Sequence, residues 1–209
     1  MHRSNQLARI DQRPVSTLGT IMPGERRRAS RLRTVYRVAR VTARGDQGLA
    51  RVQNISDEGL MITTSLPLCL GDQVRVDLSE ACSLTGTVVW HDQNRCGLRL
   101  LHAIDSAALL RRLFEERRSG RARPLRLVHS KKVVISSEHG LSVAALRDVS
   151  QCGMKIAHDG SFHSGLTVKV LLTPGVERRG VVRWSKDGIA GIALTEIFSV
   201  EDLGSLSCI

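Results

Sequence analysis

Two kinds of segment in the sequence carry side chains that could bind an anionic ligand. Residues 26–33 read Arg-Arg-Arg-Ala-Ser-Arg-Leu-Arg, and arginine forks onto phosphate oxygens and onto the O6 and N7 edge of guanine. Two turns, at residues 54–59 and 148–153, share the pattern [Asn/Asp]-x-Ser-x-x-Gly. Asx and serine side chains in such a pattern bond local backbone N–H groups, while glycine takes conformations closed to other residues. The residues alone leave two interpretations open: a guanine-nucleotide clamp, or ordinary hairpins beside a solvated basic linker.

The second half of the chain repeats the first with a period of 94 residues and without insertion or deletion. Self-similarity at a fixed period indicates duplicated structural units. Both tryptophans of the chain lie on this register. The matching pairs include Asn54/Asp148, Ser56/Ser150, Gly59/Gly153, Gly71/Gly165, Val74/Val168, Val76/Val170, Gly86/Gly180, Trp90/Trp184 and Gly97/Gly191. The sequence therefore predicts two homologous domains.

Each copy has the pattern of an all-β domain. Apolar residues alternate over residues 73–78 and again over 167–172, and short apolar runs are bounded by Gly, Asp, Asn or Ser, which favours a small barrel or sandwich. Residues 105–118 predict a helix that Asp105 or Ser106 caps and Gly120 ends. We expect a shorter counterpart around residues 199–206 and a flexible tail over residues 1–24. We expect the tryptophans to lie in the core or at the barrel rim and not to serve as stacking platforms.

Composition excludes several classes of protein. There are 31 Lys and Arg against 20 Asp and Glu, a formal net charge of +11 that favours an anionic partner. No apolar run approaches the roughly 20 residues of a membrane span, and no secretory signal is evident, so we expect a cytoplasmic protein. The five cysteines form no CxxC pair, and no two histidines have the spacing of metal ligands. Without a Ser-His-Asp arrangement or a phosphate-binding Gly-rich loop, we expect no enzyme, no metal and no cofactor.

The order Arg-x-x-x-Arg, then [Asn/Asp]-x-Ser-x-x-Gly, then a Gly-x-Val-x-Trp strand resembles the PilZ domain family. The resemblance covers about residues 25–104 and, more weakly, 119–198. It implies an all-β fold of two tandem six-stranded barrels, the first followed by an α-helix. The domains would be a tail over 1–24, a barrel with its helix over 25–118, and a second barrel over 119–209. Many members of this family are bacterial receptors for the second messenger cyclic di-GMP.

In the first copy, the family's ligand residues fall on matching positions. Arg27 and Arg31 fit the arginine pair, which in the family contacts guanine and phosphate from the segment before the barrel. Asn54, Ser56 and Gly59 fit the second motif, which holds the ligand from the barrel surface. Asn54 stands where Asp is common and keeps the acceptor oxygen without the charge. The accessory arginines are Arg26, Arg28 and Arg33.

The second copy departs from the family pattern. Asp148, Ser150 and Gly153 are intact, but in the repeat register Leu125 replaces the second arginine of the pair. Arg121 matches the first arginine, and Arg126 restores a charge only after a shift of one residue. Losing one of two bidentate arginines would cost a few kcal/mol of binding. We expect one competent site in the first copy, with a second, weaker site at Arg121, Arg126, Asp148, Ser150 and Gly153 as the alternative.

These residues are consistent with three functions. The first is a non-catalytic receptor for cyclic di-GMP, in which the ligand draws the arginine segment onto the barrel and rearranges the two domains. The second is a PilZ-type adaptor that binds a protein partner and no nucleotide. The third is a general nucleic-acid binder, which the charge favours. Aromatic residues are only 3% of the chain, which argues against base-stacking surfaces. We therefore expect cyclic di-GMP and a protein as partners, and no specific nucleic acid.

Overall fold

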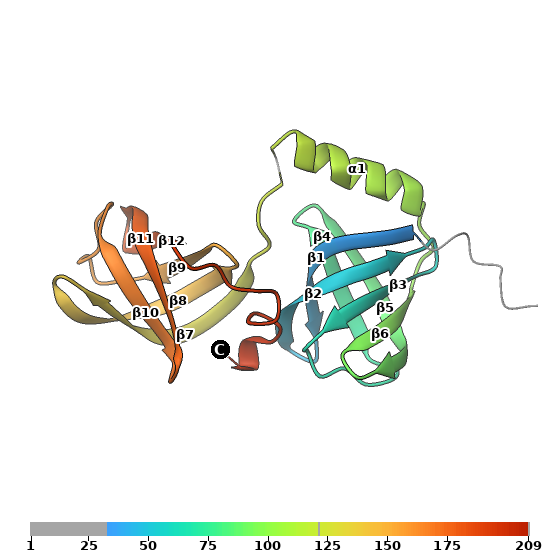
Figure 1. The fold of residues 1–209 in the computed structure, drawn as a ribbon, viewed down its shortest axis with the longest axis horizontal. Coiled ribbons are helices and arrows are strands. Elements are labelled where there is room, and N and C mark those ends of the chain that lie inside the picture. The colour runs from blue at the N-terminus through green and yellow to red at the C-terminus, as the bar shows by residue number, and fades with distance from the viewer. Residues whose placement is uncertain (1–32, 121, 209) are drawn as a thin grey trace, which may run out of the picture.

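The computed structural model describes residues 33–120 and 122–208, which form two closed six-stranded antiparallel barrels joined by one helix and a linker (Figure 1). The strand order is β1-β2-β3-β6-β5-β4 in the first barrel and β7-β8-β9-β12-β11-β10 in the second, so the duplication extends to topology. The predicted all-β fold of two tandem six-stranded barrels is confirmed. The tail predicted over residues 1–24 lies outside the described residues.

Every predicted strand is present, with ends that differ by a few residues. The first barrel comprises β1 (Arg33–Ala43), β2 (Asp46–Ile55), β3 (Gly59–Thr64), β4 (Gln73–Ser79), β5 (Cys82–Asp92) and β6 (Arg95–Leu100). The second comprises β7 (Leu127–Ser137), β8 (Gly140–Ser150), β9 (Gly153–Ala157), β10 (Thr167–Thr173), β11 (Val176–Lys186) and β12 (Ile189–Leu194).

The alternation of apolar residues fills two separate barrel interiors. Val74 and Val76 of β4 and Val170 of β10 are fully buried, as a period-2 strand with one inward face requires. Two hydrophobic clusters result, one in each barrel. Duplicated strands thus give duplicated cores.

The predicted helix is confirmed as α1 (Ser106–Arg118). The Asp105 side chain accepts a hydrogen bond from the backbone N–H of Ala108, which is N-capping. Gly120 follows the helix end with a φ of 68°. Leu113 is buried in the first barrel's cluster, and Leu109 and Leu110 pack against it. The helix therefore lies along the first barrel and leads the chain toward the second (Figure 1).

The shorter helix expected around residues 199–206 is not formed. Ser199 and Asp202 cap each other, each side chain accepting from the other's backbone N–H, and this closes a tight turn. After the turn, the Leu203 carbonyl accepts from the backbone N–H of Leu49 in the other barrel at 2.7 Å. Only a 3-10 helix, η1 (Leu206–Cys208), follows. This C-terminal segment, residues 199–207, lies between the two barrels (Figure 1).

The contact between the barrels combines a close backbone approach with apolar packing, in which Val38 of β1 and Leu49 of β2 take part. Leu49 lies in β2, yet it is 1% exposed and belongs to the second barrel's hydrophobic cluster. Next to it, a Cβ on Gly48 would stand 1.9 Å from the Gly204 carbonyl oxygen. Only a glycine lets the C-terminal segment approach β2 this closely.

Polar groups complete this interface. The Asp46 carboxylate accepts hydrogen bonds from the Ser205 and Ser207 hydroxyls at 2.6 and 2.9 Å. Burial alone would raise the pKa of Asp46, but these hydrogen bonds outweigh it and lower the pKa, so the group is ionised at neutral pH. Arg40 is paired with buried Asp77 and also donates to the Arg126 carbonyl at 2.7 Å. The barrels are therefore joined through several specific contacts.

Among the described helices, none is both long enough and apolar enough to cross a membrane.

Candidate functional site

The first polar turn is held by its own serine. The Ser56 hydroxyl accepts from the Gly59 N–H at 3.2 Å and donates to the Gly59 carbonyl at 3.1 Å, and Ser56 is 5% exposed. Glycine is required at position 59 because a Cβ there would lie 2.7 Å from the Leu98 carbonyl oxygen. Ser56 and Gly59 therefore set the shape of the turn, and Ser56 has little hydroxyl surface left for a ligand.

The same turn fixes the start of α1. The Asp57 carboxylate accepts from both the backbone N–H and the hydroxyl of Ser106, at 3.0 and 2.6 Å. The Asp57 carbonyl also accepts from the Ile104 N–H at 2.8 Å. A change in the conformation of the turn would therefore directly displace the N-terminus of α1.

Asn54 stands in a row of residues that crosses five strands on the outside of the first barrel. Strand register pairs Asn54 with Thr34 on β1 and with Met61 on β3. Met61 pairs with Gly97 on β6, and Gly97 pairs with Trp90 on β5. Among the described residues, none is hydrogen-bonded to the side-chain amide of Asn54. The outer row, as we call Thr34, Asn54, Met61, Gly97 and Trp90, thus offers a polar group, a flexible apolar side chain and an aromatic ring.

Trp90 lies flat against the backbone of Gly97. A Cβ on Gly97 would meet the indole Nε1 at 2.0 Å, so no other residue fits beneath the ring. Trp90 remains 40% exposed, and its counterpart Trp184 over Gly191 is 45% exposed. The expectation of tryptophans in the core is therefore wrong, whereas the alternative position at the barrel rim agrees with their place near the ends of β5 and β11. The missing signal was the repeated glycine seven residues after each tryptophan.

The second barrel has the same outer row with different chemistry. Register aligns Val128, Asp148, Lys155, Gly191 and Trp184 in the equivalent places. The Asp148 carboxylate, 13% exposed, pairs with Arg126 and also with Lys155 at 3.4 Å. A hollow of about 190 Å³ lies alongside, lined in part by Arg126, Lys155 and Trp184. The motif aspartate of this barrel is therefore already neutralised from within the chain.

The second turn itself matches the first. The Ser150 hydroxyl donates to the Gly153 carbonyl at 3.1 Å, and Ser150 is fully buried. A Cβ on Gly153 would lie 2.9 Å from the Ile192 carbonyl oxygen. Of the second set of predicted residues, the structure brings Arg126 into contact with Asp148. Ser150 and Gly153 shape the turn, and Arg121 lies outside the described residues.

The predicted arginine clamp of the first copy is not described by the structure. Arg26, Arg27, Arg28 and Arg31 lie outside the described residues. Arg33 begins β1 opposite Ile55, next to the Thr34–Asn54 pair. The chain therefore enters the first barrel at the end of β1 that borders the polar turn.

The arginines farther along the chain serve the fold. Arg37 donates to the Leu78 carbonyl at 2.8 Å, Arg40 pairs with Asp77, and Arg44 pairs with Asp72. The pairs Arg33/Arg37 and Arg40/Arg44 also have the Arg-x-x-x-Arg spacing, but they lie in or directly after β1.

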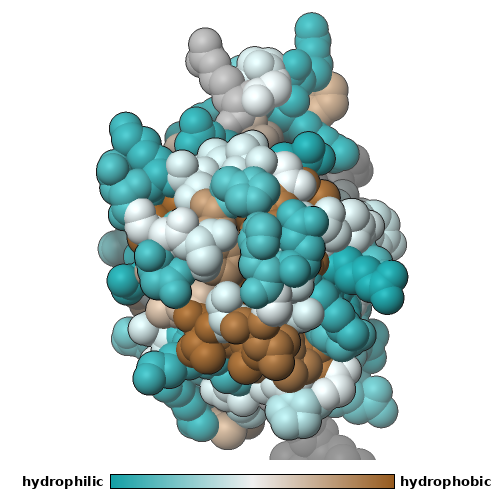
Figure 2. Space-filling view, turned by 90° about the vertical axis from the view of Figure 1, so that its left-hand side faces the viewer, coloured by the Kyte–Doolittle hydropathy of each residue, from teal (hydrophilic) through white to brown (hydrophobic). Residues whose placement is uncertain are grey.

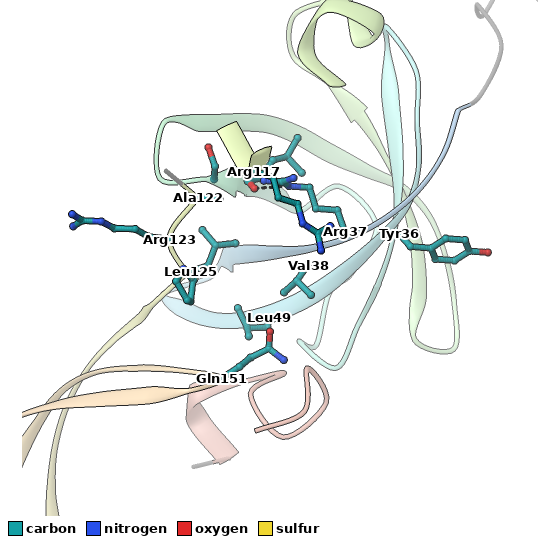
Figure 3. A pocket seen from close by; sticks show the side chains of 12 residues that line it. Tyr36, Arg37, Val38, Leu49, Arg117, Ala122, Arg123, Leu125 and Gln151 are labelled. Atoms are coloured by element: carbon teal, nitrogen blue, oxygen red, sulfur yellow. Dashed lines mark hydrogen bonds between the residues drawn. The ribbon is translucent and has the colours of Figure 1, made fainter. Parts of the chain in front are cut away.

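A second basic hollow lies at the junction of the two barrels (Figure 3). It has a volume of about 490 Å³ and receives Arg37 from β1, Arg117 from α1 and Arg123 from the linker, while Gln151 faces it from the second barrel. Burial lowers the pKa of Arg37, although arginine stays charged at neutral pH. Sequence reasoning missed this cavity because its lining comes from six separate segments.

The thiols within the first barrel do not form a reactive site. Cys82 and Cys96 are buried, and burial raises the pKa of Cys96 to about 11. A thiol with that pKa stays protonated at neutral pH and is a poor nucleophile. Cys69 and Cys152 are exposed and free.

Comparison with known family models bears on the first barrel and its helix. The family model described as PilZ domain matches residues 25–116. No curated protein sequence matches the chain significantly.

Several solved structures are similar to the chain at low sequence identity. One is the Borreliella burgdorferi PlzA protein in complex with c-di-GMP, at 13% identity and a TM-score of 0.36, covering 80% of this chain and 83% of that one. A second is the Bacillus subtilis inhibitor of motility MotI/DgrA, at 15% identity and a TM-score of 0.30, covering 78% and 88%. A third is the K. pneumonia MrkH–c-di-GMP complex, at 11% identity and a TM-score of 0.29, covering 75% and 77%.

Proposed function

We propose, from the match of residues 25–116 to the PilZ domain family model, that the chain is a non-catalytic receptor for cyclic di-GMP. The observation that carries the proposal is the outer row of the first barrel, where the side-chain amide of Asn54 has no hydrogen-bond partner among the described residues and Trp90 is exposed over Gly97. This surface lies beside the start of β1, directly after the arginine segment at residues 26–33. A bis-phosphate ligand with two guanines matches a polar amide, an aromatic face and a cluster of arginines.

The proposal gives each predicted residue a role. Arg27 and Arg31 would hold phosphate and guanine from the segment before the barrel, with Arg26, Arg28 and Arg33 adding attraction. Asn54 would contact a guanine edge, while Ser56 and Gly59 keep the turn in shape. The ligand would rest on Met61 and Gly97 and against the Trp90 ring.

The second barrel is proposed not to bind the ligand at neutral pH. A ligand there would have to replace two cations, Arg126 and Lys155, on the Asp148 carboxylate. In the first barrel the corresponding residues, Asn54 and Met61, are uncharged and form no ion pair with each other that a ligand would have to replace. The duplication has therefore left the proposed ligand surface free in the first barrel and occupied by the chain's own cations in the second.

The output is proposed to pass through α1. Binding at the polar turn bears on Asp57, which holds the first residues of the helix. The helix ends at Arg118, and the linker that follows lines the basic cavity between the barrels. A shift of the helix would therefore change how the second barrel sits on the first.

The two tryptophans offer a direct test of the binding surface. The chain has only two, so Trp184→Phe leaves Trp90 as the single indole. We expect cyclic di-GMP to quench Trp90 emission in this variant in a saturable way, because a guanine would lie against the ring. The measurement is tryptophan fluorescence during titration.

The matched control for this experiment is Trp90→Phe, which leaves Trp184 of the second barrel as the single tryptophan. Its emission should stay constant over the same ligand range. A response from Trp184 with none from Trp90 would place the site in the second barrel and contradict the assignment.

One observation favours the adaptor function for the second barrel. Val134, Val143 and Leu171 pair in register across β7, β8 and β10, and with Leu141 they form a partly to fully exposed apolar surface. Figure 2 shows an apolar patch on this side of the molecule. Exposed apolar patches mark interaction surfaces. An adaptor would bind its partner equally well with and without cyclic di-GMP, whereas the receptor would not.

A further inference from the structure

Three side chains from two separate loops of the second barrel converge. Glu138 and His139 lie in the turn between β7 and β8, and His163 lies in the loop between β9 and β10. One ligand atom from each lies within 4.8 Å of the other two. The spacing rules applied to the sequence could not find this group, because the two histidines are 24 positions apart.

The distances within this group match those of metal ligands. The Nε2 atoms of His139 and His163 are 3.5 Å apart, and the Glu138 Oε1 lies 3.7 Å from the His139 Nε2. Two ligands at about 2.0–2.1 Å from one tetrahedral ion would be separated by about 3.3–3.4 Å. An ion placed among the three atoms would need only small side-chain adjustments.

The orientation of His163 also suits a ligand. Its Nδ1 lies 3.2 Å from the Ser164 carbonyl oxygen. If Nδ1–H donates to this carbonyl, the free lone pair is on Nε2, the atom that faces His139. Metal-binding histidines commonly have their second nitrogen fixed in this way.

The backbone on both sides of the site is well anchored. Phe162 is buried in the second barrel's core, the Ser164 hydroxyl donates to the Arg183 carbonyl, and the Gly165 N–H donates to the Val182 carbonyl. On the other side, the His139 N–H donates to the Ser137 hydroxyl. The two segments would therefore present their side chains with little loss of backbone freedom.

The first barrel has an ion pair at the junction that corresponds to this group. In the repeat register Glu138 corresponds to Arg44, His163 to Cys69 and Leu166 to Asp72. In the first barrel Arg44 pairs with Asp72 at 2.7 Å, and this ion pair ties the hairpin turn to the loop. The second barrel lacks both members of that pair and carries Glu138, His139 and His163 at the same junction.

From these contacts we propose that Glu138, His139 and His163 bind a divalent transition-metal ion of the zinc class. The ion would take the place of the Arg44–Asp72 pair and fasten the β7–β8 turn to the β9–β10 loop. Two imidazoles and one carboxylate are a donor set that zinc accepts, with water in the fourth position. The inference does not depend on the proposed binding of cyclic di-GMP.

The test is calorimetric titration of untagged, chelator-treated full-length protein with zinc chloride. We expect one high-affinity equivalent in the micromolar range and a thermal unfolding midpoint that rises with zinc concentration. His163→Ala and His139→Ala should each weaken zinc binding by at least about tenfold. Cobalt(II) in place of zinc should give the visible absorption of a tetrahedral ion in the wild type and not in these variants.

The matched control is His91→Ala, a substitution that removes an exposed histidine of the first barrel. This variant should bind zinc with the affinity of the wild type. Circular dichroism would check that each variant keeps its strand signal. Absence of micromolar zinc binding would overturn the proposal, as would zinc binding that is unchanged in His163→Ala.

Discussion

Replacing Arg31 with alanine is expected to abolish measurable binding of cyclic di-GMP while leaving both barrels folded. A charge-assisted, bidentate arginine contact contributes about 3 kcal/mol, which corresponds to roughly 100-fold in Kd. Arg31 precedes the barrel, so its removal should not change the unfolding midpoint. Isothermal titration calorimetry and thermal unfolding of the same variant would measure both effects.

Two controls separate a site effect from a loss of net charge. Arg111→Ala removes one exposed cation from α1 and should bind the ligand as the wild type does. Arg126→Ala removes the cation that pairs with Asp148 of the second barrel, and this variant too should retain the wild-type affinity. Retained affinity in Arg31→Ala, or equal losses in all three variants, would refute the assigned clamp.

Replacing Gly48 with alanine is expected to release the C-terminal segment from the first barrel. The added methyl would overlap the Gly204 carbonyl oxygen, 1.9 Å away, and both partners are backbone atoms or attached to them. Overpacking of this kind costs about 1–3 kcal/mol, and the Leu49–Leu203 hydrogen bond would be lost with it. We expect small-angle scattering to show a larger radius of gyration, because the barrels are no longer held together.

Glu201→Gln is the matched control at the same interface. It removes the Arg51–Glu201 ion pair, whose side chains are 49% and 60% exposed. Exposed pairs contribute little, about 0–1 kcal/mol, so this variant should keep the wild-type dimensions. A compact Gly48→Ala protein would show that the close approach does not hold the barrels together.

The local pattern predicted most of the fold. The 94-residue repeat gave two equal domains, the alternation in residues 73–78 and 167–172 gave strands with one buried face, and Asp105 marked the start of the helix. These features depend on neighbours in the chain, and periodicity reports them directly. The helix expected at residues 199–206 failed because Ser199 and Asp202 close a turn and Leu203 pairs with another barrel.

The parts that sequence reasoning missed all depend on contacts between distant segments. Leu49 lies on the outer face of β2, opposite to the core residues Ala50 and Val52, and fills the second barrel's cluster. Its repeat counterpart, Val143, is exposed. The same limit hid the cavity between the barrels and the convergence of His139 with His163.

The candidate site was predicted in part. The positions of Asn54, Ser56 and Gly59 could be named from the motif, but their division of labour required coordinates. Ser56 and Gly59 shape the turn, while Asn54 points into the outer row with Met61 and Trp90. The pairing of Asp148 with both Arg126 and Lys155 likewise depends on strand register, which spacing alone does not reveal.

The central claim is that this chain binds cyclic di-GMP, and calorimetric titration of the full-length protein tests it most directly. GTP and GMP serve as controls for general attraction of anions to a chain of net charge +11. We predict saturable heat with cyclic di-GMP in the micromolar range or tighter, and none with the controls. No heat with cyclic di-GMP at any salt concentration, or equal heat with GTP, would contradict the receptor function and favour an adaptor that binds protein alone.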